Sequence, residues 1–163
     1  MPQLQTAEDV AAAAAAAHGG DIDGTYIVTG GSSGIGEETA RVLALYGATV
    51  VVAARSEQRG QAAVSRINGA GGAGRAVFEM LDLGSFASVD GFVQRWRQRQ
   101  HKGGGPTLPP LRAIVLNAGL ISSTYGRTAD GVESNLQVNH LAQHELVTQL
   151  LPCDPPNPIT LNC

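Results

Sequence analysis

A glycine-rich turn lies between an apolar segment and a helical pattern near the start of the chain. It reads Thr-Gly-Gly-Ser-Ser-Gly-Ile-Gly and occupies residues 29–36. Gly30 permits a sharp turn, Gly34 gives backbone N–H groups access to a phosphate, and Gly36 lets the following helix approach the strand closely. The turn predicts pyrophosphate binding at a helix N-terminus, and the alternative is a flexible loop without a ligand. The candidate contact residues are Gly30, Ser32, Ser33, Gly34, Ile35 and Gly36.

A basic residue follows the second apolar segment, where dinucleotide-binding domains commonly carry an acidic residue for the ribose hydroxyls. Here the residue is Arg55, and Ala53 and Ala54 before it carry no charge. Because a guanidinium pairs with a 2′-phosphate, Arg55 favours NADP(H), with NAD(H) as the second choice and Ser56 as a further phosphate donor. The alternative is that Arg55 is a solvated surface charge.

Strand-like and helix-like segments alternate along the chain and would position these residues. Apolar runs of strand length occupy 25–28, 49–54, 75–81 and 112–116. Helical patterns occupy 35–46, 56–68, a segment that Ser85 can cap, and 131–151. This alternation predicts an α/β fold with a doubly wound parallel (Rossmann) sheet of four to five strands and helices on both faces. Residues 1–24 are predicted to be a lead-in, with at most a short helix, and 25–163 the domain.

Four ordered motifs resemble the short-chain dehydrogenase/reductase family. The spacing Thr-Gly-x-x-x-Gly-x-Gly is similar to that family's turn, and the resemblance spans about Gly24 to Leu151. Asp82 and Leu83, after the third strand, resemble its adenine-contacting pair. Asn117-Ala118-Gly119, after the fourth strand, resembles its Asn-Ala-Gly motif. The resemblance implies that all these residues contact the dinucleotide.

The segment from Asp130-Gly131 to Asn139-His140-Leu141 resembles the branch that contains retinol dehydrogenases and WW-domain oxidoreductases. Two departures weaken this subfamily assignment. Leu116 replaces an asparagine of many relatives, and Ala142-Gln143-His144 replaces a usual Gly-His-Phe.

The family resemblance also implies a set of catalytic groups: a tyrosine acid/base, a lysine four residues later, a serine and an asparagine. Only the asparagine has a clear match, Asn139, which the resemblance assigns to a proton-relay water and which we expect to face inward from an apolar helix. The alternative is a polar group tied to neighbouring backbone.

The tyrosine–lysine pair has no match in the 163 residues. The single lysine, Lys102, has Gln98 four residues before it. Tyr26, Tyr46 and Tyr125 therefore receive no catalytic role. Residues 159–163 resemble the start of the strand that carries the family's serine, so we expect the domain to be truncated before the catalytic Ser and Tyr-x-x-x-Lys segment.

Composition argues against several other functions. A net charge of −3 gives no general attraction to nucleic acid, and no segment is long enough to span a membrane. Cys153 and Cys163 lack metal or redox spacing, which favours inert thiols and a cytoplasmic location, with an organelle address left open. His140 and His144 share a helix face but have no acidic or cysteine partner in a known motif, so no metal site is predicted.

The sequence supports two functions from different classes. The first is an NADP(H)-dependent oxidoreductase that acts on a small-molecule alcohol or carbonyl and is represented here by its cofactor-binding portion. The second is a non-catalytic dinucleotide-binding module that associates with a complete relative, as a homo- or heterodimer through the last helix. A non-functional fragment is the third alternative.

Overall fold

Parallel strands form the centre of the chain. The computed structural model describes residues 6–17, 22–100, 108–151 and 159–162, with backbone alone for 159–162. The strands are β1 (Thr25–Thr29), β2 (Thr49–Ala54), β3 (Arg75–Met80), β4 (Leu111–Leu116) and β5 (Ile159–Asn162). Their order is β3-β2-β1-β4-β5, and every neighbouring pair is parallel. The predicted doubly wound sheet is therefore confirmed.

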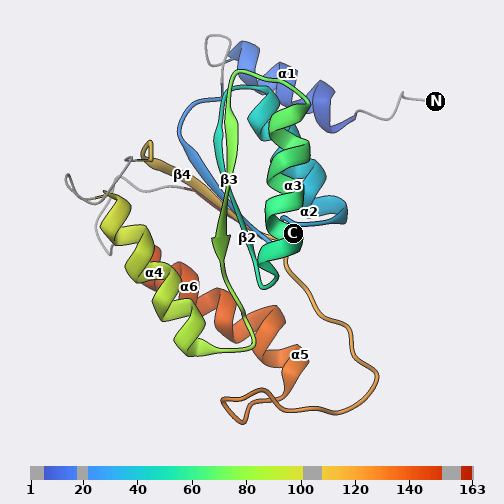
Figure 1. The fold of residues 1–163 in the computed structure, drawn as a ribbon, viewed down its shortest axis with the longest axis vertical. Helices are drawn as coiled ribbons and strands as arrows, with labels where there is room; N and C mark the ends of the chain where they lie inside the picture. The colour runs from blue at the N-terminus through green and yellow to red at the C-terminus, as the bar shows by residue number, and fades with distance from the viewer. Residues whose placement is uncertain (1–5, 18–21, 101–107, 152–158, 163) are drawn as a thin grey trace.

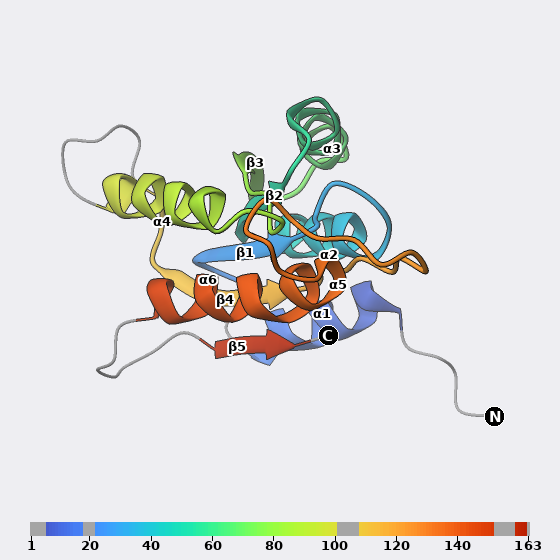
Figure 2. The ribbon, with the colours of Figure 1, turned by 90° about the horizontal axis from the view of Figure 1, so that it is seen from below.

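Helices cover both faces of this sheet. They are α1 (Ala7–Ala17), α2 (Gly34–Leu45), α3 (Glu57–Gly69), α4 (Phe86–Gln100), α5 (Ser134–Leu136), η1 (Gln137–Leu141) and α6 (Ala142–Leu150). Residues of α2 and α3 pack on one face of the sheet and residues of α4 and α6 on the other, and Figure 2 shows α3 and α4 on opposite sides of β2 and β3. In the N-terminal lead-in, α1 lies beside α2, where the Arg41 guanidinium pairs with Glu8 and Glu38.

Successive side chains of β2 point to opposite faces of the sheet and pack into two separate hydrophobic cores. Val50 and Val52 are fully buried in the core under α2 and α3, with Ile67 among its members. Val51 points to the other core, where Phe92 of α4 is also buried. Full burial of each such side chain stabilises the fold by roughly 1.5–3 kcal/mol. A strand apolar at every position is the expected pattern for a sheet covered on both faces.

Glycine and serine end and begin the helices where the sequence predicts. Gly47 has φ +106°, its N–H donates to Ala44, and the N–H of Ala48 donates to Leu43, which is the Schellman arrangement. Ser56 accepts a hydrogen bond from the N–H of Arg59 at 3.4 Å, and Ser85 accepts from Ser88 at 3.4 Å. These local signals fix the places where the chain reverses between strands and helices.

The last helix, predicted over roughly 131–151, starts later than expected and contains a π turn. Gly131 has φ +78° in a turn, and the helix begins at Ser134. The Glu133 carboxylate accepts from the N–H groups of Asn135 and Leu136 at 2.9 and 2.8 Å and caps this end. Residues 137–141 then form a π turn before α6, which changes the direction of the side chains that follow.

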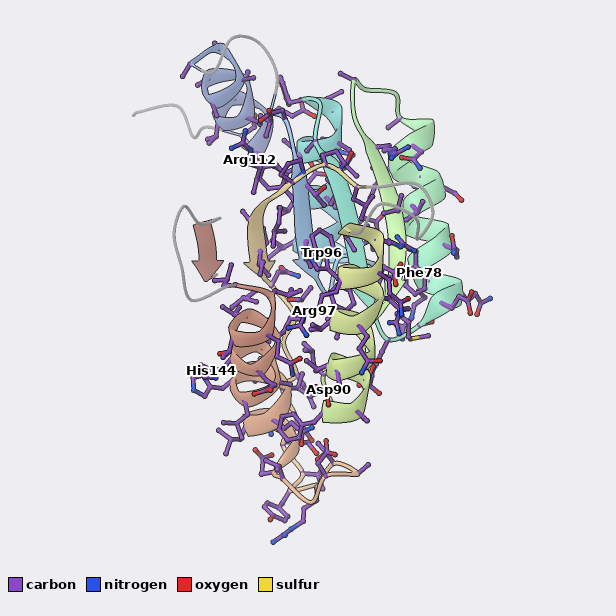
Figure 3. The ribbon with its side chains drawn as sticks, turned by 90° about the vertical axis from the view of Figure 1, so that its left-hand side faces the viewer. Phe78, Asp90, Trp96, Arg97, Arg112 and His144 are labelled. Atoms are coloured by element: carbon purple, nitrogen blue, oxygen red, sulfur yellow. The ribbon has the colours of Figure 1, made fainter. Side chains whose placement is uncertain are left out.

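Polar contacts join α6 to α4 across the edge of the core. Arg97 donates to the Gln149 carbonyl oxygen at 3.0 Å, and the Gln149 amide donates to Asp90 at 2.6 Å. In Figure 3, Arg97 and Asp90 project from α4 toward α6, while His144 points away from it. The pair of helices is therefore held together at more than one point.

Candidate functional site

The glycine turn follows the carboxyl end of β1. Gly30 has φ +67°, and a Cβ there would lie 2.9 Å from Cα of Ala118. A Cβ on Gly36 would overlap the Asn117 amide and the Gly30 carbonyl. Gly34 has open space around it but φ +57°, so backbone conformation rather than crowding requires glycine there.

The N-terminus of α2 faces this turn with its backbone donors uncapped by a side chain. Ser33 is the N-cap residue, and its side chain makes no capping hydrogen bond. Glu37, in the first turn, would repel an anion. Its carboxylate instead forms a two-point pair with Arg66 of α3, at 2.7 and 2.9 Å. The helix end therefore keeps the donors and partial positive charge that suit a phosphate.

The residues after β4 are tied to the glycine turn by hydrogen bonds. The Asn117 side chain donates to the Thr29 carbonyl at 2.9 Å, and the Ala118 N–H donates to the Thr29 hydroxyl at 3.0 Å. Thr29 itself is fully buried. Two motifs that are 88 residues apart in sequence thus form one rigid unit.

A cleft of about 390 Å³ runs along the carboxyl edge of the sheet. Eleven of the residues that the sequence singles out line it, namely Gly30, Ser32, Ser33, Ile35, Gly36, Arg55, Asp82, Leu83, Asn117, Ala118 and Gly119. Gly34 shapes the turn but is not among the lining residues. A cleft at the point where strand order reverses is the usual ligand site of doubly wound sheets.

One end of this cleft is basic. Arg55 and Ser56 lie there, as predicted, together with Arg59, which the sequence reasoning missed. The sequence shows Arg59 only as a charge in the first turn of a serine-capped helix, because Arg55 lies before that helix and no helical spacing relates the two. Both arginines are exposed, and no ion pair forms on either within the described residues. Asp82 lies beyond them, with one carboxylate oxygen accepting from the Gly84 N–H at 2.8 Å.

Asn139 lies in a hollow that adjoins the opposite end of the cleft and shares Asn117 to Leu120 with it. The expected inward orientation is wrong, because Asn139 is exposed. Its side-chain amide accepts from the Leu120 N–H at 2.6 Å and donates to the Leu120 carbonyl at 2.8 Å. This pairing with neighbouring backbone matches the alternative reading of the residue.

The other chemistry-bearing side chains lie away from the cleft. Tyr26 is in β1, Tyr46 ends α2, and Tyr125 is in the loop after β4. The rings of His140 and His144 lie 6.4 Å apart, and the described residues contain no cluster of three metal-ligating side chains. Lys102, Cys153 and Cys163 fall outside the described residues. In the described part of the chain, no helix has the length and hydropathy needed to cross a bilayer.

The fold and the cleft define the class: a doubly wound α/β domain with a glycine turn at its switch point. The family model for short chain dehydrogenase matches residues 25–154. The chain belongs to the short-chain dehydrogenase family, in the branch that contains WW-domain oxidoreductases and retinol dehydrogenases.

Two curated relatives and one solved structure illustrate the similarity. A WW domain-containing oxidoreductase from Drosophila melanogaster is 38% identical over 82% of this chain and 31% of its own length. A polyprenol dehydrogenase from Mus musculus is 46% identical over 77% of this chain and 35% of its own length. A short-chain dehydrogenase from Sphingobium yanoikuyae in complex with NADPH is 27% identical, with a TM-score of 0.62 over 79% of this chain and 48% of that one. The chain spans about a third of these two curated relatives.

Two glycines of the turn should respond differently to alanine. Gly36→Ala should lower the free energy of unfolding by about 2–3 kcal/mol, because the new methyl overlaps Asn117 and backbone. Gly34→Ala should cost about 1 kcal/mol, from backbone conformation alone. Urea unfolding followed by circular dichroism measures both, and equal costs would contradict the packing shown here.

The cap on α5 should depend on pH. Hydrogen bonds from the backbone N–H of Asn135, then of Leu136, hold the pKa of Glu133 below its ordinary value. A carboxyl group with a depressed pKa stabilises the fold above its unfolded value, about 4.3, and loses this contribution as pH falls through the folded pKa. The urea midpoint of the unmodified chain should exceed that of Glu133→Ala at pH 7, and the gap should close toward pH 3. A gap that does not change with pH would contradict the cap.

Proposed function

We propose that the chain is the NADP(H)-binding portion of a short-chain dehydrogenase/reductase that acts on an alcohol or carbonyl substrate. One observation carries this proposal: a single cleft joins the basic end at Arg55 and Arg59, the glycine turn, and the Asn117–Gly119 segment. Two of the similar proteins support the same reaction class: one curated relative is a polyprenol dehydrogenase, and one solved structure is a short-chain dehydrogenase in complex with NADPH.

The shape of the cleft fits a dinucleotide. A Cβ at Gly30 or Gly36 would fill the turn, and the N-terminal donors of α2 are left for an anion. In the proposed complex, this helix end holds the pyrophosphate, Asp82 and Leu83 lie along the adenine, and Asn117 to Gly119 form the wall beside the nicotinamide half. The nicotinamide ring, when bound, supplies or accepts the hydride.

The basic end supports NADP(H) over NAD(H). Arg55, Ser56 and Arg59 all line the cleft where the chain leaves β2. No carboxylate occupies positions 53–55, at the end of β2, where one would accept hydrogen bonds from the ribose hydroxyls. Because a 2′-phosphate takes charge-assisted hydrogen bonds from guanidinium, this end would hold the extra phosphate of NADP(H).

A second candidate function is a non-catalytic dinucleotide-binding module. It is favoured by the sequence of the 163 residues, which contains no Tyr-x-x-x-Lys. In this proposal the chain binds the dinucleotide and associates with a complete relative, as a homo- or heterodimer, through the α5–α6 helix.

Removing the basic end should lower cofactor discrimination. We expect the unmodified chain to bind NADPH at least about tenfold more tightly than NADH, since charge-assisted hydrogen bonds are worth about 1.5–3 kcal/mol. Arg55→Ala should reduce this ratio toward one, mainly by weakening NADPH. Arg75→Ala, an exposed arginine at the start of β3 and away from the carboxyl edge, is the matched control. Isothermal titration with both nucleotides measures the ratio, and equal affinities in the unmodified chain would rule out the preference.

Turnover distinguishes the two candidate functions for the chain itself. We expect the purified 163-residue chain to bind NADPH without reducing a carbonyl, because no tyrosine has the lysine needed to bring its pKa down from about 10. The assay follows NADPH absorbance with an aldehyde or ketone present. Measurable turnover would show that the chain is catalytic without that pair.

A further inference from the structure

Three side-chain amides on the last helix bind the segment that follows β4. They belong to Asn135, Asn139 and Gln143, which are spaced four residues apart along the α5–η1–α6 helix. Their backbone partners are Ser122, Leu120 and Ala118, which are spaced two residues apart and run in the opposite direction. We refer to these three pairings as the amide ladder.

The two asparagines make the same two-point contact. Asn135 accepts from the Ser122 N–H at 2.9 Å and donates to the Ser122 carbonyl at 3.3 Å. Asn139 does the same with Leu120, at 2.6 and 2.8 Å. Each primary amide therefore pairs with both polar groups of one residue, as a neighbouring β-strand would.

Gln143 completes the ladder through Thr29. Its amide nitrogen donates to the Ala118 carbonyl at 2.9 Å, and its oxygen accepts from the Thr29 hydroxyl at 3.0 Å. The same hydroxyl accepts from the Ala118 N–H, so both polar groups of Ala118 are satisfied. Gln143 is buried, with 5% of its surface exposed.

The spacing of the two partners explains why the pairings repeat. Four residues of helix advance about 6.0 Å, and two residues of extended chain advance about 6.6 Å. Successive amides therefore meet alternate residues of the segment 118–122. Glu133 also accepts from the Asn135 side chain at 2.9 Å and orients the outermost amide.

This segment forms the end of the cleft that lies opposite Arg55. Ala118, Gly119 and Leu120 line the cleft, whereas the basic residues lie at the end of β2, on the other side of the glycine turn. Figure 1 shows the chain leaving β4 and extending past the carboxyl edge before it returns to α5. Within the described part of the chain, no strand pairs with residues 117–122. The side-chain amides of the last helix therefore supply the hydrogen bonds that a neighbouring strand would make.

We propose that Asn135 and Gln143 are positioning residues, which with Asn139 hold the 118–122 backbone as a preformed wall for the nicotinamide half of the cofactor. The inference rests on the proposed function and adds two residues that do not themselves line the cleft. Without them, the segment must be ordered when the cofactor binds, and the cost of ordering weakens binding. The adenosine half, bound at the far end, does not meet this wall.

Two probes separate the halves of the cleft: NADPH and adenosine 2′,5′-bisphosphate, which lacks the nicotinamide half. Asn135→Ala and Gln143→Leu should each weaken NADPH about five- to tenfold, as the loss of one or two hydrogen bonds implies, and leave the bisphosphate within twofold. Gln143→Leu leaves the buried Thr29 hydroxyl without this acceptor and so lowers stability. Asn135 is half-buried, and Asn135→Ala is therefore the variant with the smaller effect on folding.

The chain provides a matched control in Asn68. Its amide makes the same two-point contact, with Ala76 at 2.7 and 3.0 Å, but at the start of β3 and away from the cleft. Asn68→Ala should lower stability to a similar extent and change neither affinity. Equal weakening of both probes in Asn135→Ala and Gln143→Leu, or no change in either, would overturn the proposal.

Amide hydrogen exchange tests the ladder without any ligand. The N–H groups of Ala118, Leu120 and Ser122 should be protected, and those of Gly119 and Ile121, which donate no hydrogen bond in the described residues, should exchange rapidly. Asn135→Ala should remove the protection of Ser122. Uniform exchange from 118 to 122 would overturn the ladder. If the unmodified chain shows this alternation but binds neither probe, the proposed cofactor site fails, and the positioning role fails with it.

Discussion

The buried hydroxyl of Thr29 is the contact on which the arrangement of the site depends. It accepts from the Ala118 N–H and donates toward the Val115 carbonyl and the Gln143 side chain. These partners come from β4, the turn after it, and α6. Because Thr29 is also the first residue of the glycine turn, the strand ends on either side of the switch point are fixed relative to each other. A hydroxyl is suited to this place because it is both donor and acceptor.

The two ends of the cleft differ in charge and in how their residues are held. The basic end has two exposed arginines, Arg55 and Arg59, neither of which forms an ion pair within the described residues. The other end is a backbone wall held by amides, with little side-chain charge. A rigid apolar and amide wall beside a charged, adaptable end suits a ligand that is anionic at one end and uncharged at the other. The glycine turn between them supplies the donors for a central anion.

The sequence alone could predict the sheet and most of the lining of the cleft, since apolar runs, glycines and caps act locally. It did not predict where the last helix begins, because glutamate is not among the preferred N-cap residues and no local pattern marked the π turn. Asn135 and Gln143 were missed for another reason: their partners lie 13 and 25 residues away. Arg59 was visible as a charge, but only the fold places it beside Arg55.

If the carboxyl edge of the sheet is a dinucleotide site, titration with NADPH will change the amide chemical shifts of the residues along that edge. We expect the largest changes on the backbone of residues 30–36, with further changes at 55–59, 82–83 and 117–120. Shifts confined to other parts of the chain, or none at saturating NADPH, would contradict it.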